Sequence, residues 1–390
     1  MNPRLSPNEI FAQSERRAGE ILAAKNRMLI AAPERSERQS ALDWGIARAR
    51  HFFKQALHIA GFWSDFHSIA AGGRDWISAY VAWSLLEDDA LAAQDVEAAI
   101  TVLLADQYPS GAWGYRPGLP ADMDSTSWAA LCLRKFNAGW DANRTLDILI
   151  GHQNARSGGI QTYLGPQFGI GAYVGARPGD DLSGWCSAHV CITAVAVQAM
   201  LACGLAGDHP ALESCVAFIR QQQRPDGHWD AYWYHGKTYA TTQCVRALLQ
   251  SGAKPAEMAF TQALRWLRHT QLADGSWNDG AAGTAGRVAD TALAVCAWLA
   301  LDPGPAPTLA KAIAWLLNEQ WPDGSWNALP ILQLPAANEH EPWQIREWPE
   351  IGGSLTQGIC IADRNRYFTT ATALQALSAW RKSQTLEANA

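Results

Sequence analysis

Apolar positions recur along the chain with a helical period, and the pattern repeats about every 50 residues. Amphipathic stretches such as 93–106 and 260–270 are each followed by a short turn and then by a stretch rich in small and apolar residues. Repeats of this length are typical of arrays of paired helices. The sequence therefore predicts an all-α protein built from alternating amphipathic and apolar helices.

Five of the turns begin with glutamine and carry a glycine four or five residues later; they start at Gln107, Gln153, Gln223, Gln271 and Gln320. Four continue to a tryptophan, and Gly61-Phe62-Trp63 keeps only that last part. Glycine supplies the positive φ that ends one helix before the next begins. We expect the glutamines to bond free amides of the following inner helix and the tryptophans to pack between outer helices.

The small-residue stretches align on one hydroxyl-bearing position, which we place at Ser78, Thr126, Ser187, Thr241, Thr291 and Thr370. The next residue is small in all six, which lets neighbouring helices approach closely. We therefore predict one closed (α/α)6 barrel of six inner and six outer helices over residues 39–390. Residues 1–38 form an N-terminal arm, packed on the outside or partly disordered. Insertions at 158–183 and 327–365 both precede inner helices, so both should lie at one mouth of the barrel.

The glutamine-led turns and the segment Asp122-Met123-Asp124-Ser125-Thr126 resemble the squalene-hopene cyclase and class II terpene cyclase superfamily, whose fold is shared with protein prenyltransferase β subunits. In that family the motif is Asp-x-Asp-Asp-Thr, and its middle aspartate protonates an alkene or epoxide to start a carbocation cascade. The resemblance implies that Asp124 is the acid and Asp122 its supporting carboxylate. Ser125 stands where the family usually has a third carboxylate, and the chain has one helical domain where squalene cyclases have two.

An acid that protonates a carbon–carbon double bond must be neutral at pH 7 and shielded from water. Burial and a neighbouring carboxylate produce that state because both oppose ionisation. The alternative is that Asp122 and Asp124 merely cap the helix that follows them. The family resemblance favours the acid.

Aromatic residues lie level with Asp124 on four of the other inner helices, two positions before the aligned hydroxyl: Trp76, Trp185, Tyr239 and Phe368. Aromatic faces stabilise cations by ~0.5–2 kcal/mol each. Together with Trp128, on the helix of Asp124, they are expected to contact the substrate. The alternative is that they are ordinary packing residues.

Cations occupy four of the positions one turn nearer the mouth: Arg74, Lys237, Arg287 and Arg366. Helix N-termini already favour anions, so this ring would hold a diphosphate or carboxylate head group. His235, just ahead of the fourth inner helix, would bind the head or accept the terminal proton. The alternative is a set of solvated charges at helix entrances.

The composition narrows the choice of partners and cofactors. A net charge of −6 argues against a nucleic-acid surface, and no apolar run approaches a membrane span, although peripheral membrane contact stays open. Eight cysteines and the lack of an apolar leader predict reduced thiols in the cytoplasm. Cys186, His189 and Cys191 have a poor spacing for metal, so we favour buried thiols with a hydrogen-bonded histidine and predict no metal site.

The sequence thus predicts a class II terpene cyclase-like enzyme, an isomerase or lyase. It would protonate an alkene of an isoprenoid with an anionic head such as a prenyl diphosphate, and guide cyclisation or rearrangement. No cofactor is expected, apart from Mg²⁺ with a diphosphate substrate. The alternatives are a zinc enzyme like the protein prenyltransferases and a non-catalytic toroid that binds a lipid or protein.

Overall fold

The computed structural model describes residues 35–68, 71–87, 93–165, 169–254, 256–278, 285–303, 306–349 and 354–388. Most of the predicted N-terminal arm, residues 1–34, lies outside the described residues. Residues 35–38 form the start of helix α2 (Arg35–Ala56).

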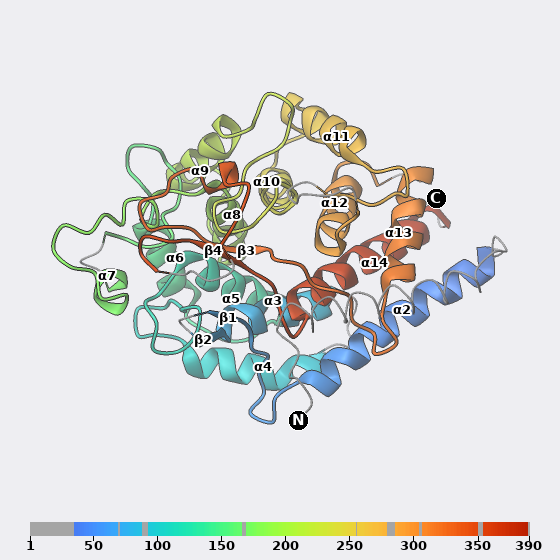
Figure 1. Ribbon diagram of the computed structural model, residues 1–390, viewed down its shortest axis with the longest axis horizontal. Coiled ribbons are helices and arrows are strands. Elements are labelled where there is room, and N and C mark those ends of the chain that lie inside the picture. Colours follow the sequence, from blue (N-terminus) through green and yellow to red (C-terminus); the bar gives the residue numbers. More distant parts are fainter. Residues whose placement is uncertain are drawn as a thin grey trace, which may run out of the picture.

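Twelve helices form two concentric rings (Figure 1). The inner ring consists of α3 (Asp75–Glu87), α5 (Met123–Phe136), α8 (Val190–Ala202), α10 (Thr238–Gln250), α12 (Val288–Leu301) and α14 (Tyr367–Ala388). The outer ring consists of α2, α4 (Ala93–Asp106), α6 (Ala142–Gly151), α9 (Pro210–Gln221), α11 (Met258–Thr270) and α13 (Pro307–Glu319). Each inner helix contacts the next, and α14 returns to α3. The predicted (α/α)6 barrel is confirmed.

Inner and outer helices differ in their hydrophobic pattern, because inner helices bury more of their surface than outer helices do. Helix α8 is apolar on every side, and residues 191–200 are all buried. Helix α11 is amphipathic and buries one stripe, which consists of Phe260, Ala263, Trp266 and Leu267. An all-round apolar helix needs neighbours on every side, whereas a striped one belongs at the surface.

The glutamine-led turns tie three helices together at each corner. In the turn after α11, the backbone N–H of Trp277 donates to Thr291 Oγ1 of inner helix α12, and the indole donates to the Leu267 carbonyl of α11. Gln271 Nε2 donates to the carbonyls of Gly275 and of Thr308 in outer helix α13. The expectation that glutamine bonds inner-helix amides is therefore wrong, because its NH₂ group bonds carbonyls of its own turn and of the next outer helix.

The same device closes the ring. Gln320 Nε2, after α13, donates to the carbonyl of Gly45 in α2 at 2.8 Å. Gly324 in this turn has φ +91°, and a Cβ there would lie 2.1 Å from the Arg48 carbonyl oxygen. Only glycine allows α13 and α2 to approach this closely.

The register of the third inner helix differs from the prediction by six residues. In the other repeats, the backbone N–H of the turn residue bonds the aligned hydroxyl; in the third, Ile160 N–H bonds Thr193 Oγ1 at 2.8 Å. Ser187, the position we aligned, lies before α8 begins. Cys191 rather than Trp185 therefore lies level with Asp124. Small residues around Ser187 imitate the inner-helix pattern, and only the hydrogen bond identifies the true register.

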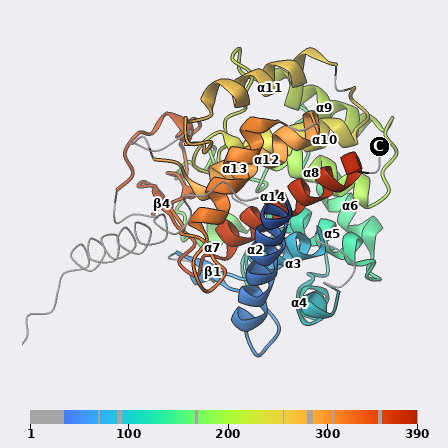
Figure 2. The same cartoon turned by 90° about the vertical axis from the view of Figure 1, so that its right-hand side faces the viewer.

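The two insertions meet at one end of the barrel. There the first insertion forms α7 (Ile170–Tyr173), and the second forms β3 (Leu332–Leu334), 3-10 helix η3 (Pro342–Gln344) and β4 (Ile359–Ile361), with β3 antiparallel to β4. The hairpin of β1 (Asp65–Ser68) and β2 (Ala71–Gly73) lies at the same end, on the left in Figure 2. Ile170, Leu182 and Ala337 join the insertions in a small apolar cluster of their own. No described helix has the length and apolar character of a bilayer span.

Candidate active site

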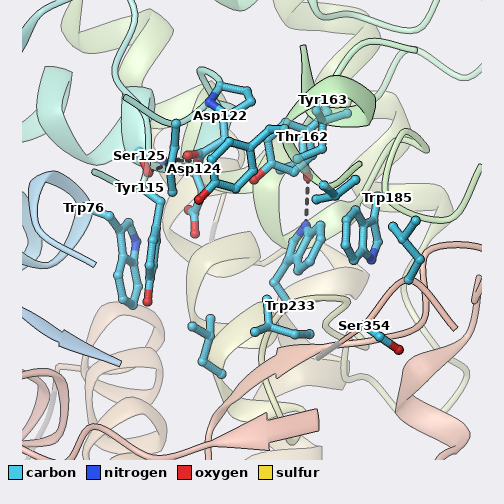
Figure 3. A pocket seen from close by; sticks show the side chains of 18 of the residues that line it. Trp76, Tyr115, Asp122, Asp124, Ser125, Thr162, Tyr163, Trp185, Trp233 and Ser354 are labelled. Carbon is cyan, nitrogen blue, oxygen red and sulfur yellow. Dashed lines mark hydrogen bonds between the residues drawn. The ribbon is translucent and has the colours of Figure 1, made fainter. Parts of the chain in front are cut away.

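A cavity of roughly 810 Å³ opens between the inner helices and the two insertions. It is lined mainly by aromatic and aliphatic side chains, with a few polar groups (Figure 3). The lining residues are Trp76, Tyr115, Leu119, Pro120, Asp122, Asp124, Ser125, Thr162, Tyr163, Ile170, Tyr173, Val174, Trp185, Trp233, Leu332, Leu334, Ser354, Leu355 and Thr356. A largely apolar chamber with few polar groups is the usual form of a small-molecule site.

The floor of the cavity is a stack of buried aromatic rings. Tyr234 stacks on Tyr239 with ring centroids 3.5 Å apart, and Phe368 stacks on Tyr80 at 4.7 Å. Trp128 Nε1 donates to the Tyr239 hydroxyl. These rings pack inside the barrel beside Asp124, which Tyr234 contacts directly.

Asp124 meets the cavity from the first turn of α5. Its side chain is almost fully buried, and its Oδ2 accepts a 2.5 Å hydrogen bond from the Tyr234 hydroxyl. Burial raises the pKa of Asp124 to about 8, with a further rise from the charge of Asp122, while the Tyr234 bond lowers it. The carboxyl is therefore protonated at neutral pH. Oδ2 is engaged as an acceptor, whereas buried Oδ1 has no partner that meets hydrogen-bond geometry among the described residues, although the Trp128 indole is near enough to lower the pKa of Asp124. We therefore assign the proton to Oδ1.

Asp122 and Asp124 have different roles, although both belong to one motif. Asp122 is the N-cap of α5, and its two oxygens accept hydrogen bonds from the Ser125 N–H and hydroxyl, both at 2.7 Å. Burial raises the pKa of Asp122 to about 6, and the Ser125 bonds oppose that rise. The capping alternative thus describes Asp122 alone. Ser125, the departure from the family motif, supplies the hydroxyl that holds this second carboxylate.

Tyr234, the partner of the acid, was not among the residues we predicted. The second insertion holds it in place: Tyr234 forms an isolated β-bridge with Leu332, and buried Gln333 donates through Nε2 to the Tyr234 carbonyl at 2.9 Å. The available signal was the aromatic run Tyr232-Trp233-Tyr234 beside His235. The sequence pattern does not say which of these rings faces the acid.

The predicted aromatic contacts divide into two groups. Trp76 and Trp185 line the cavity, whereas Trp128, Tyr239 and Phe368 lie in the floor and support it. Trp185 reaches the cavity from a loop rather than from α8, and its indole donates to the Pro335 carbonyl of the second insertion. Four further lining aromatics escaped the sequence analysis: Tyr115, Tyr163, Tyr173 and Trp233.

The predicted ring of cations does not form around the cavity. Arg74 pairs with Asp75 and Asp106 and lies over the Phe62 ring. Arg287 lies near Asp290 and donates to the Pro330 carbonyl, and Arg366 pairs with Asp323 and stacks on Trp321. None of them lines the cavity. These residues stand at or just before the first helical turn, so helical periodicity does not fix the direction of their side chains.

Lys237 and His235 also lie outside the cavity lining. Lys237 is the N-cap of α10. His235 bonds the second insertion, with its backbone N–H on the Ile331 carbonyl and its Nδ1 3.4 Å from Gln333 Oε1. Neither residue is therefore placed at the cavity in which the head group was expected to bind. His235 faces the second insertion.

Over the described part of the chain, no three His, Cys, Asp or Glu side chains converge in a way that could hold a metal ion. Cys186 lies before α8, and Cys191 lies within it. His189, between them, is engaged at both ring nitrogens by Thr162 and by the Gly184 carbonyl. This agrees with the hydrogen-bonded histidine favoured from the sequence.

Sequence comparison matches residues 185–331 to the family described as squalene-hopene cyclase C-terminal domain. A labda-7,13-dienyl diphosphate synthase from Streptomyces clavuligerus is 40% identical over 60 residues, which is 15% of this chain and 11% of that protein. A squalene–hopene cyclase from Zymomonas mobilis is 26% identical over 88 residues, 23% of this chain and 13% of that protein. These matches span only a small part of the curated relatives.

Structural comparison covers far more of the chain. A variant of the type II terpene cyclase MstE from Scytonema, in complex with its substrate geranylgeranyl dihydroxybenzoate, superposes with a TM-score of 0.79 and 28% identity. The superposition covers 89% of this chain and 99% of that chain. The resemblance indicated by the turns and the aspartate motif is confirmed.

Proposed function

We propose that this chain, a member of the class II terpene cyclase family, is an enzyme that starts a carbocation cyclisation by protonating an alkene with Asp124. The observation that carries the proposal is a carboxyl group kept neutral by burial at the wall of an aromatic cavity. A neutral carboxylic acid at pH 7 has little structural use but is the required proton donor. The isoprenoid-binding relatives support the same chemistry.

The chain's own residues account for the first step. Asp124 transfers the proton on Oδ1 to the terminal alkene carbon, and the alkene electron pair forms the new C–H bond. The resulting carboxylate keeps the hydrogen bond from Tyr234, which is stronger once its acceptor is charged. Trp76 and Trp185 present their rings to the cation, and the apolar lining excludes the water that would quench it.

The head group of the substrate is proposed to carry less charge than a diphosphate. In the described part of the chain the cavity lining contains no lysine or arginine, and toward the second insertion it offers the hydroxyls of Ser354 and Thr356. Hydroxyl groups suit a phenol or carboxylated ring better than a diphosphate, whose recognition usually needs cations. A prenylated aromatic such as the MstE substrate therefore fits better than the prenyl diphosphate we expected from the sequence.

The test is turnover of supplied isoprenoids by the purified protein. Geranylgeranyl dihydroxybenzoate, geranylgeranyl diphosphate and squalene are incubated separately, and extracts are analysed by mass spectrometry for isomers with fewer double bonds. We expect cyclised product from the first, less from the second, and loss of turnover by at least a thousandfold in Asp124→Asn with binding retained by calorimetry. Unchanged turnover in that variant would exclude Asp124 as the acid.

The two alternatives are less well supported. The matched relatives are cyclases, so a zinc enzyme like the protein prenyltransferases is not favoured. A non-catalytic toroid that binds a lipid or protein would not need a carboxyl group with a raised pKa at position 124. We propose that the cyclisation needs no cofactor, since the proton comes from the protein. Full turnover in buffer containing EDTA would support this.

A further inference from the structure

A hydroxyl–imidazole pair on the cavity wall takes no part in the steps above. Thr162 lines the cavity, and its Oγ1 lies 2.9 Å from Nδ1 of His189, the N-cap residue of α8. Nε2 of His189 lies 2.9 Å from the carbonyl oxygen of Gly184. The indole N–H of Trp233 donates to the same Thr162 oxygen at 2.8 Å, as drawn in Figure 3.

The partners fix where each hydrogen lies. A carbonyl oxygen can only accept, so His189 carries its ring hydrogen on Nε2. Burial lowers the pKa of His189 to about 3, and nearby His340 lowers it slightly further, so the ring is neutral. Nδ1 is then a bare acceptor, and the Thr162 hydroxyl donates its hydrogen to it.

The Thr162 hydroxyl oxygen has a lone pair that no hydrogen bond in the described part of the chain uses, and this lone pair points to a use in the reaction. A hydroxyl has one hydrogen and two lone pairs. The hydrogen is directed at His189, and one lone pair accepts from Trp233. Within the described residues these bonds leave a second lone pair on an oxygen whose side chain lines the cavity.

We propose that Thr162, with His189 as its positioning residue, is the base that ends the cyclisation; this rests on the proposed function. The last carbocation loses a proton from the carbon beside its cationic centre to Thr162 Oγ1, and the electrons of that C–H bond form the product alkene. In the same step the original hydroxyl hydrogen of Thr162 moves to Nδ1 of His189. Asp124 has lost one proton and His189 has gained one, so the product is an isomer of the substrate.

Burial opposes a charged His189 ring, but one contact favours a short-lived imidazolium. The Tyr232 ring stacks on His189 with centroids 3.7 Å apart, and an aromatic face stabilises a cation. Repeated turnover requires that a proton return to Asp124 after the product leaves. A carbocation is so strong an acid that a weak base suffices, provided that the base is neutral when the cation forms.

A second hydroxyl on the wall is less suitable. Ser125 also lines the cavity and donates to Asp122, but it is the residue next to the acid Asp124. A base there would remove a proton from the first cation before any ring forms. The Thr162 backbone carbonyl accepts from the N–H of Met123, but its hydroxyl is directed at His189 and Trp233, away from the first turn of α5 (Figure 3).

Product analysis of matched variants tests the proposal with geranylgeranyl dihydroxybenzoate. Thr162→Val and His189→Asn retain Asp124, so they should still consume substrate, but the share of the wild-type alkene should fall at least tenfold in favour of alcohols and isomeric alkenes. Asparagine at 189 can accept the Thr162 hydrogen bond without being basic, so it separates basicity from packing. Thr162→Ser should restore the alkene, and Thr101→Val, on the exposed face of α4, is the control.

The outcomes separate the two proposals. If the wild-type protein cyclises no supplied isoprenoid, the proposed function fails. If it does, and folded Thr162→Val and His189→Asn variants give wild-type products in wild-type proportions, the base assignment is wrong. Histidine ¹⁵N spectra of the wild-type protein provide a second check that needs neither substrate nor variant folding: the assignment requires a neutral Nε2–H ring at pH 7, and a protonated or Nδ1–H ring would overturn it.

Discussion

The hydroxyl of Tyr234 lies 2.5 Å from Oδ2 of Asp124, although 110 residues separate the two in the chain. The bond joins the first turn of α5 to the loop before α10. It leaves Oδ1 as the protonated oxygen and partly offsets the effect of burial on the pKa of Asp124. Burial therefore sets the high pKa of the acid, and this phenol lowers it and occupies one of its two oxygens.

The pH dependence of turnover should report the acid. Because burial raises the pKa of Asp124 to about 8, the carboxyl is protonated below that pH and ionised above it. We expect kcat/KM to be level near neutrality and to fall about tenfold per pH unit above pH 8. Steady-state kinetics between pH 6 and 10 measure this. A tenfold fall per pH unit already present between pH 6 and pH 8 would mean that an ordinary carboxyl acts instead.

Tyr234→Phe should weaken the acid, although the aromatic ring at this position is kept. The phenol favours the carboxylate, so its loss should raise the pKa of Asp124 further and move the basic limb of the pH profile upward. Turnover should fall roughly ten- to a hundredfold, the equivalent of one hydrogen bond to a charged group. Tyr367→Phe, which removes a hydroxyl near α2, is the matched control. Equal profiles for the two variants would contradict this role.

Asp124→Asn should stabilise the fold increasingly as the pH rises. The folded-state pKa of Asp124 is about 8, against the ordinary aspartate value of 3.8, so the folded protein retains a proton that the unfolded chain loses between these values. Wild-type stability thus falls relative to the variant from about pH 4 to pH 8. Melting temperatures of both proteins at pH 5 and pH 8 test this. The difference should be larger at pH 8, and a larger difference at pH 5 would refute the shift.

Trp76 should influence the fate of the cation more than the binding of substrate. Trp76→Leu keeps an apolar side chain in the lining but removes the aromatic face, which is worth ~0.5–2 kcal/mol to a cation. We expect a two- to thirtyfold loss of kcat, little change in KM and more early-terminated products. Trp76→Phe should recover most of the loss. If the leucine and phenylalanine variants behave alike, the role of Trp76 is shape alone.

Gln320→Ala should weaken the closure of the ring. It removes the two hydrogen bonds that buried Nε2 donates to the carbonyls of Gly45 in α2 and Gly324 in its own turn, and the one that Oε1 accepts from Arg48 of α2. The expected loss is about 1–3 kcal/mol of unfolding free energy, since the carbonyls are left unpaired. Chemical denaturation measures it, with the exposed Gln222→Ala as the control. Equal stability of the two variants would show that the corner bonds contribute little.

The sequence by itself determined the barrel and the position of Asp124, because both depend on local chemistry. Helical period, positive-φ glycines and the repeated turn predict paired helices, and the aspartate motif placed Asp124 at the start of an inner helix. Trp76 faces the cavity as predicted because it lies within a regular helix, where spacing fixes direction.

Only the tertiary structure decided what surrounds the acid. Tyr234, Thr162 and Trp233 come from loops, whose side-chain directions follow from partners far away in the chain, as the bond between Gln333 and the Tyr234 carbonyl shows. The arginines at helix entrances turned toward acidic residues and backbone carbonyls rather than toward the axis, since no helical spacing holds them there. The direction of a side chain within a helix follows from its position in the local sequence. The direction of a side chain outside a helix depends on contacts with residues far away in the chain.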